Sequence, residues 1–175
     1  MTKQELEICI DKYNRDVYSF CKYLTSNTQE ADDLYQDTFL TAMECREKID
    51  YNRHPKSYLL SIALRIWKNK KRKFAWRKRI AEAQLLVEER DAEISESPEP
   101  TPEESITRQE EDVAVRMAVN ALPEKLRIPV LLFYMENLST AQIAAAMKIP
   151  VGTVLSRLHQ ARKKLKKELE EIIHE

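Results

Sequence analysis

The chain of 175 residues contains a single glycine, Gly152. An average glycine content of about 7% would place about 12 glycines in a chain of this length. Glycine supplies the positive φ angles of tight β-hairpins and lets the backbone approach phosphate groups closely. The sequence therefore excludes a Rossmann crevice and a P-loop, and it predicts an all-α fold.

Three amphipathic segments lie in the first half of the chain. Residues 2–5 have the pattern of a capping box, and apolar residues follow at helical spacing. A second cap pattern at 27–30 opens a helix that we expect to end near residue 46 and to turn Leu34, Tyr35, Phe39, Ala42 and Met43 toward the first helix. After a break at 52–55, a third helix is predicted from about Lys56. It should bury Leu59, Ile62, Ala63 and Ile66 in a core that the three helices share.

The charges cancel overall but are sorted into blocks. Residues 51–80 carry 11 basic and no acidic side chains, whereas residues 81–112 carry 12 acidic and 2 basic ones. A basic stretch of this density indicates a polyanionic partner. Residues 88–108 contain three prolines and few apolar side chains, so they bury too little surface to offset the entropy of ordering. We predict a helical domain at 1–87, an acidic, proline-rich linker at 88–108 and a second helical domain at 109–175.

The second domain contains a helix-turn-helix pattern. Residues 139–142 cap a short helix, 148–150 form a turn, and 151–153 open a second helix with an apolar stripe on one face and basic residues on the other. Pro129 lies inside the helix expected after Leu122-Pro123, so we expect a kink or a late start there. The alternative interpretation is an ordinary helical hairpin with a solvated basic face.

Other features argue against catalysis, metal binding and membrane insertion. No run of 18 apolar residues occurs, and the first residues lack the apolar centre of a signal peptide, so we expect a cytoplasmic protein. Cys9, Cys21 and Cys45 have no metal-type spacing and are interpreted as small buried residues, with a redox sensor as the alternative. Asp33 and Asp37 lack a nearby histidine or third carboxylate. We therefore expect no enzymatic activity, no cofactor and no metal site.

Three runs of the sequence resemble bacterial sigma factors of the extracytoplasmic-function (ECF) group. LPEKLRIPVLLFYMENLSTAQIAAAMKIPVGTVLSRLHQARKKL, at 122–165, resembles the domain of these factors that binds the promoter −35 element. ADDLYQDTFLTA, at 31–42, resembles their polymerase-binding helix, and SYLLSIALRIWKNKKRK, at 57–73, resembles their −10 element helix. The resemblance implies an alternative sigma factor, a non-catalytic subunit that directs RNA polymerase to promoters and melts the −10 region.

The resemblance also implies partners and site residues. The partners are core RNA polymerase, bound through the clamp helices of its largest subunit, promoter DNA and an anti-sigma factor. Polymerase binding would involve Asp33, Leu34, Gln36, Asp37 and Phe39, of which Leu34 and Phe39 also serve the core. Binding of −10 DNA would involve Lys56, Ser57, Tyr58, Arg65, Trp67, Lys68, Asn69, Lys71 and Arg72. Binding of −35 DNA would involve Thr153, Leu155, Ser156, Arg157, His159, Gln160, Arg162 and Lys163.

The residues themselves suggest how these sets would act. The basic run is interleaved with Tyr51, Tyr58, Trp67, Phe74 and Trp76, and positive charge with aromatic faces suits single-stranded DNA. For both tryptophans the alternative is packing, which we favour for Trp76. In the second domain, Ser156, His159 and Gln160 are candidates for contact with base edges. Arg157, Arg162 and Lys163 are candidates for contact with phosphates.

The chain departs from the family pattern at several positions. Met147-Lys148 stands where Leu-Gly is frequent, so the turn must form without the usual glycine. Leu155 stands where a basic residue is frequent, and Gln160 where arginine is frequent, so we expect a different −35 preference. Leu64-Arg65 replaces a frequent Arg-Asn in the −10 helix.

Two other classes of function remain open from the sequence. A stand-alone helix-turn-helix transcriptional regulator would use residues 1–80 for sensing or dimerisation, but such a domain does not need the basic helix at 65–79. A helical adaptor would contact acidic proteins through its basic faces, and it would bind little nucleic acid even at low salt.

Overall fold

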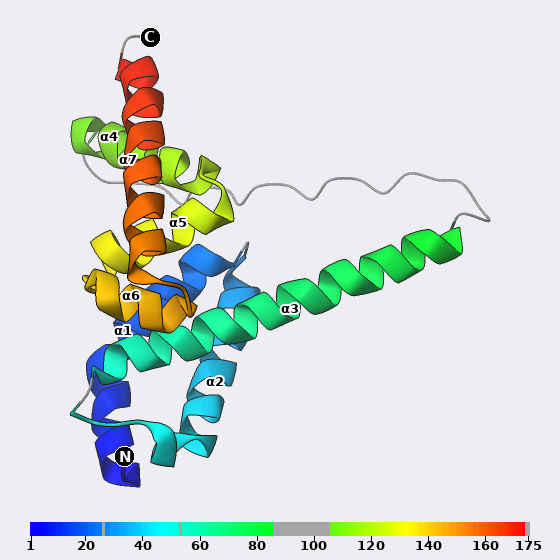
Figure 1. Ribbon diagram of the computed structural model, residues 1–175, viewed down its shortest axis with the longest axis vertical. Helices are drawn as coiled ribbons and strands as arrows, with labels where there is room; N and C mark the ends of the chain where they lie inside the picture. Colours follow the sequence, from blue (N-terminus) through cyan, green and yellow to red (C-terminus); the bar gives the residue numbers. More distant parts are fainter. Residues whose placement is uncertain (26, 53, 86–105, 174–175) are drawn as a thin grey trace. The chain divides into compact units, whose positions relative to one another are not determined.

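The computed structural model describes residues 1–173 except 26, 53 and 86–105. All regular secondary structure within the described residues is helical, which confirms the predicted all-α class (Figure 1). No described helix combines the length and the apolar character that crossing a membrane requires. The predicted linker at 88–108 lies outside the described residues, apart from its last three, which begin a helix.

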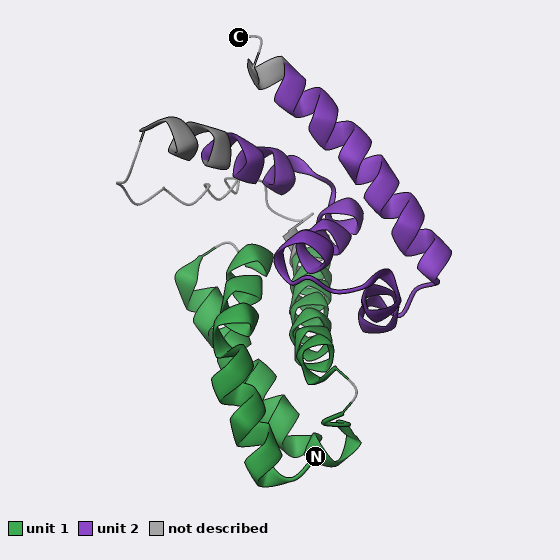
Figure 2. Ribbon diagram, turned by 90° about the vertical axis from the view of Figure 1, so that its left-hand side faces the viewer, with its two compact units in different colours: residues 1–99 green, residues 100–175 purple. Residues whose placement is uncertain are grey.

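The chain divides into two compact units, residues 1–99 and residues 100–175 (Figure 2). Unit 1 contains α1 (Lys3–Leu24), α2 (Thr28–Glu44), the short 3-10 helix η1 (Arg46–Lys48) and α3 (Pro55–Leu85). Each of the three α-helices packs against the other two. Their shared core contains Leu6, Cys9, Val17, Phe20, Cys21, Leu24, Ala31, Leu34, Phe39, Ala42, Leu59, Leu60, Ile62, Ala63 and Leu64.

The predicted starts of the first two helices are confirmed. The backbone N–H of Glu5 donates to Thr2 Oγ1 over 3.2 Å, and the N–H of Thr2 donates to Glu5 Oε2 over 2.7 Å, which completes the capping box. The N–H of Glu30 donates to Asn27 Oδ1 over 2.8 Å. These side chains satisfy N–H groups that have no partner within the helix, and for that reason the helices begin there.

The third helix is buried only along its first half. Leu59, Ile62 and Ala63 lie in the core as predicted, whereas Ile66 is half-buried. From Lys68 to Ile80 every side chain is exposed. Figure 1 shows this half of α3 extending beyond α1 and α2. The exposed half contains most of the basic residues of the chain's 51–80 block.

Unit 2 is built around its last helix. It contains α4 (Ile106–Ala121), α5 (Glu124–Val130), the π-helical turn η2 (Leu131–Met135), α6 (Thr140–Met147) and α7 (Val151–Ile173). Helices α4, α5 and α6 each pack against α7. The core contains Ala118, Leu122, Leu126, Ile128, Val130, Leu131, Leu132, Leu138, Ile143, Ala144, Met147, Val154, Leu158 and Ala161.

Pro129 lies inside α5, and the predicted irregularity follows it directly. The helix begins at Glu124, so a late start does not occur. Because proline has no N–H, Pro129 cannot donate the backbone hydrogen bond to the carbonyl four residues before it that a regular α-helix requires. The N–H of Leu131 is shared between the carbonyls of Arg127 and Ile128, and the chain then widens into η2. The proline is thus accommodated by a π-helical turn, a known way to relieve an interrupted helix.

The helix-turn-helix turn closes without glycine. Ser139 and Gln142 form a capping box at the start of α6, as predicted. At the other end of α6, Lys148 adopts the left-handed conformation, with φ 54° and ψ 49°. Its N–H donates to the carbonyls of Ala144 and Ala145, which terminates the helix. Lysine therefore occupies a backbone conformation that ordinarily favours glycine.

Candidate nucleic-acid interface

The predicted −35 residues gather on the outward side of α7. Val154, Leu158 and Ala161 point into the core of unit 2 and set the orientation of the helix. As a result, most of the predicted set is exposed: Leu155, Ser156, His159, Gln160, Arg162 and Lys163. Thr153 and Arg157 are half-buried. One face of α7 thus presents polar and basic groups to a ligand, as a recognition helix does.

A shallow hollow lies beside the first turns of this helix. Its volume is about 350 Å³, and its lining comprises Lys125, Leu126, Gly152, Thr153, Ser156, Arg157 and Gln160. Gln160 Nε2 donates to Ser156 Oγ over 3.3 Å, so two candidate base-reading groups are already aligned. The cationic side chains and the N-terminal end of α7 both favour a negatively charged group in the hollow.

Arg162 contacts a neighbouring element as well as solvent. Its Nε donates to the phenol oxygen of Tyr134 over 2.7 Å. Its guanidinium carbon lies 5.9 Å from the ring centroid of Phe133 and 5.8 Å from that of Tyr134. The contact joins α7 to η2 across 28 residues of sequence. Spacing along one helix could not have identified it.

Four of the residues predicted to bind −10 DNA lie along one face of α3, whose exposed half carries basic side chains on every side. Arg65, Lys68, Asn69 and Arg72 recur at intervals of three or four residues, which places them in one row on a helix with 3.6 residues per turn. Arg72 Nη2 donates to Asn69 Oδ1 over 3.3 Å. The structure therefore brings together four of the residues predicted to bind −10 DNA.

The start of α3 is more strongly tied to its own unit. Lys56 Nζ lies 2.8 Å from Asp16 Oδ2 on α1, and the lysine side chain is largely buried. Ser57 Oγ donates to the carbonyl of His54 over 2.9 Å. Ser57 and Tyr58 are half-buried at the edge of the preceding loop. Lys56 therefore anchors this edge of the interface to α1.

The two tryptophans have the opposite burial to that expected. Trp67, which we assigned to DNA, is only 8% exposed, whereas Trp76, for which we favoured packing, is 61% exposed. Trp67 follows Leu60 and Ala63 by seven and four residues, so it shares their buried face. Lys71 lies over its ring, with Nζ 4.9 Å from the centroid. Trp76 is nine residues further on, about two and a half turns, and so lies on the opposite side of α3.

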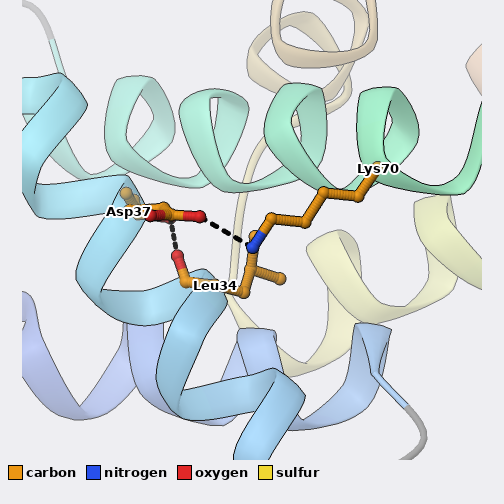
Figure 3. A network of polar contacts seen from close by, with 4 residues as sticks. Leu34, Asp37 and Lys70 are labelled. Atoms are coloured by element: carbon orange, nitrogen blue, oxygen red, sulfur yellow. Dashed lines mark hydrogen bonds and ion pairs between the residues drawn. The ribbon is translucent and has the colours of Figure 1, made fainter. Parts of the chain in front are cut away.

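The predicted polymerase-binding residues divide between core and surface. Leu34 and Phe39 are buried, which confirms their expected role in the core. Asp33 and Gln36 are exposed. Asp37 Oδ2 lies 2.7 Å from Lys70 Nζ on α3 (Figure 3). The hydroxyl of the following Thr38 donates to the carbonyl of Leu34 over 2.6 Å.

Two apolar residues extend this surface of α2. Leu40 is 58% exposed and Met43 is 45% exposed, so the expectation that Met43 packs against the first helix is wrong. They follow Asp33 by seven and ten residues, which continues the same helical face. For Leu40, the sequence signal was the pair of polar residues seven and four positions before it, Asp33 and Gln36. Such a mixed surface is typical of a protein-binding site.

The three cysteines lie in or near the core of unit 1. Within the described residues, no group of three or more His, Cys, Asp or Glu side chains could hold a metal ion. Cys9 and Cys21 are buried and Cys45 is half-buried, and all three are free thiols. Burial raises the pKa of Cys9, with smaller and opposing effects from Lys12 and Glu5. A buried thiol with a raised pKa is poorly suited to nucleophilic or redox chemistry.

Two domain families match the chain in the order of its two units: Sigma-70 region 2 over residues 9–78, and Sigma-70, region 4 over residues 112–165. The ECF RNA polymerase sigma factor SigW of Bacillus subtilis is 29% identical over 174 residues, which cover 93% of this chain and 88% of SigW. The RNA polymerase sigma-H factor of Pseudomonas aeruginosa is 29% identical over 178 residues, covering 99% of this chain and 90% of that protein.

A solved structure shows the same fold. The sigma factor RpoE, in complex with the anti-sigma factor NepR from Bartonella quintana, aligns with a TM-score of 0.75 and 21% identity, covering 94% of this chain and 96% of RpoE. The chain belongs to the ECF sigma factors. The predicted function, an alternative RNA polymerase sigma factor, is thereby confirmed, and the stand-alone regulator is excluded. Regions 2 and 4 bind core RNA polymerase and promoter DNA.

Proposed function

We propose that residues 1–87 bind polymerase and the promoter −10 element and that residues 109–175 bind the −35 element. Residues 88–108 link these two domains. The observation that carries this proposal is the pair of exposed basic helix faces, one on α3 and one on α7, in two separate compact units. Two sites that each bind DNA weakly give a high overall affinity when a partner holds them at a fixed distance from each other. Core polymerase is that partner.

On the −35 element, Gln160 and Ser156 read base edges, and His159 lies beside them on the same face. A glutamine amide can bond an adenine edge in the major groove with two hydrogen bonds. The hydroxyl of Ser156, 3.3 Å from Gln160 Nε2, favours one orientation of that amide. Arg157 and Lys163 bind phosphates, and Arg162, held by Tyr134, secures α7 against η2 as well.

On the −10 element, the row Arg65, Lys68 and Arg72 follows the backbone of the melted strand. Ser57 and Tyr58, half-buried beside the preceding loop, contribute to the pocket for a flipped base. Positive charge along a track with aromatic groups at its edge is the usual arrangement for single-stranded DNA. Lys71, which covers Trp67, contributes positive charge at the side of this row.

Polymerase docking uses the surface of α2. Asp33, Gln36 and Asp37 provide polar groups that fit cationic and amide partners on the clamp helices, and Leu40 with Met43 provides the apolar area that such an interface buries. The chain itself performs no bond-making step. It acts in the cytoplasm, where core polymerase and promoters are, and an anti-sigma factor restrains it, as the complex of RpoE with NepR suggests.

Reconstitution with core polymerase tests the proposal. The full chain should co-elute with core enzyme, and sequencing of transcript 5′ ends should reveal start sites that core enzyme alone does not use. The isolated chain should bind promoter DNA only weakly. Failure to co-elute, or unchanged start sites, would refute the proposal. Nanomolar, sequence-specific binding without polymerase would indicate a different mode of action.

A further inference from the structure

Trp76 is an exposed aromatic residue in the basic row of α3. Arg65, Arg72 and Trp76 are separated by seven and four residues, so they share one side of the helix, and Arg79 follows Trp76 by three. All four side chains are exposed, and Trp76 leaves 61% of its surface in water. The row that we assign to −10 DNA therefore continues past its basic residues to a large flat ring.

The other exposed aromatic of α3 lies elsewhere on the helix. Phe74 is 70% exposed, but it follows Trp67 by seven residues and so continues the face that faces the core of unit 1. Phe74 and Trp76 point to nearly opposite sides, because two residues turn a helix by about 200°. Phe74 is also flanked by basic residues, Lys70 four positions before it and Lys78 four positions after it, but on a different side of the helix from Arg65, Arg72 and Trp76. Phe74 is therefore a matched control, an exposed aromatic ring in basic surroundings outside the row assigned to −10 DNA.

The surroundings of Trp76 define the chemistry of its ligand. Residues 51–80 contain 11 basic and no acidic side chains, so a partner on this face carries negative charge along its length. Arg72 and Arg79 lie about 6 Å and about 4.5 Å from Trp76 along the helix axis, one on each side. A flat apolar ring between two cations fits a nucleic-acid strand whose base stacks on the ring while its phosphates meet the guanidinium groups.

We propose that Trp76 stacks on an unstacked base of the promoter strand next to the −10 bases, with Arg72 and Arg79 on the flanking phosphates. The proposal rests on the function proposed above and adds a further base-contacting residue to it. Trp76 replaces the buried Trp67 as the stacking tryptophan of this interface.

Intrinsic fluorescence tests the contact directly. The chain has two tryptophans, so Trp67→Phe leaves Trp76 as the single emitter, and Trp76→Phe leaves Trp67. Titration of the full-length chains with a single-stranded oligonucleotide of the non-template promoter strand should quench the emission of Trp76. The emission of the buried Trp67 should stay unchanged. Because the chain without polymerase should bind weakly, the titration is carried to saturation, which the anisotropy of a labelled oligonucleotide reports independently. At saturation, equal quenching in both variants, or none in either, overturns the proposal.

A scan of single abasic sites in the holoenzyme locates the base. For wild-type protein, one abasic site flanking the −10 bases should shorten the lifetime of the open complex by roughly 5- to 150-fold, the range expected for one stacked base. Trp76→Leu should shorten it by the same factor on intact DNA, and the abasic site should then add nothing. Trp76→Phe should retain part of the lifetime, and Phe74→Ala all of it.

The outcomes separate this proposal from the one on which it rests. If the wild-type holoenzyme forms no open complex, the proposed function fails. If it does, and the abasic losses are the same in Trp76→Leu as in wild type, only the stacking role of Trp76 is refuted. A loss of affinity for core polymerase in Trp76→Leu would instead assign the ring to a protein contact and would also refute it.

Discussion

Lys70 Nζ lies 2.7 Å from Asp37 Oδ2 and joins the basic helix α3 to the proposed polymerase-binding face of α2 (Figure 3). The lysine side chain is 50% exposed and the aspartate side chain 43% exposed. Solvent therefore screens the pair, and such ion pairs contribute about 0–1 kcal/mol to stability. With 43% of its side chain exposed, Asp37 can contact Lys70 and a partner on the docking face at the same time.

Substituting each partner of this ion pair in turn should distinguish its contribution to stability from the contribution of Asp37 to polymerase binding. Asp37→Asn and Lys70→Met should each lower the free energy of unfolding of unit 1 by less than about 1 kcal/mol. Only Asp37→Asn should weaken binding to core polymerase, because Asp37 lies on the proposed docking face. Urea unfolding followed by the emission of Trp67, together with polymerase affinity, checks both. An equal loss of affinity in the two variants would contradict a direct role for Asp37.

The left-handed turn residue offers a stabilising substitution. Lys148→Gly should raise the stability of unit 2 by about 1 kcal/mol, because a side chain in this conformation costs roughly that much. Lys148→Ala removes the side chain but retains the Cβ, so it should give no such gain. Hydrogen exchange of the amides of α6 and α7 measures the change within this unit. A comparable gain in both variants would show that the charge, and not the backbone, is responsible.

Alanine substitutions of Gln160 and of Lys163 should have different effects on binding to the −35 element. Gln160→Ala should remove about 1–3 kcal/mol of discrimination at one base pair of the −35 element. Lys163→Ala should weaken binding about equally for all sequences and reduce the slope of log affinity against log salt by about 1. Holoenzyme binding to a set of single-base −35 variants at several salt concentrations distinguishes the two. Uniform weakening by Gln160→Ala would remove it from the base-reading set.

Two leucines three residues apart on α7 should differ sharply in their effect on stability. Leu158 is buried in the core of unit 2, so Leu158→Ala should cost about 2–5 kcal/mol. Leu155 is exposed, and Leu155→Ala should change stability by less than about 0.5 kcal/mol while altering −35 preference. Hydrogen exchange in α5 and α7 reports the first effect, and binding to −35 variants the second. A large loss of protection in Leu155→Ala would place that side chain in the core.

The buried thiol of Cys9 should make unit 1 sensitive to alkaline pH. Burial raises the pKa of Cys9 above its ordinary value of 9.0, so the folded state retains the proton longer than the unfolded state. The stability linked to this group is present below pH 9.0 and is lost as the pH rises toward the folded pKa. Wild-type protein should therefore lose stability relative to Cys9→Ala above that pH. Parallel stability curves for the two proteins would exclude the thiol as the cause.

The sequence by itself determined the fold class and the two modules. One glycine in 175 residues left helices as the available structure, and the caps at Thr2, Asn27 and Ser139 placed three helix starts correctly. These features are local, because a cap needs only residues within one turn of it. The helix-turn-helix and the basic run are likewise contiguous in sequence, so spacing and charge predicted a nucleic-acid partner. The sigma-factor function was implied by the resemblance of three runs to that family.

Only the tertiary structure decided which side chains of those helices are exposed to a binding partner and which are buried. Periodicity indicates the face of α3 on which Trp67 and Trp76 lie, but not the point at which α1 and α2 stop covering the helix. The same holds for Met43, which was expected to face α1 and is 45% exposed. Arg162 with Tyr134 and Lys70 with Asp37 are contacts between residues 28 and 33 positions apart. Such contacts form only when packing brings separate helices together, and no local pattern encodes them.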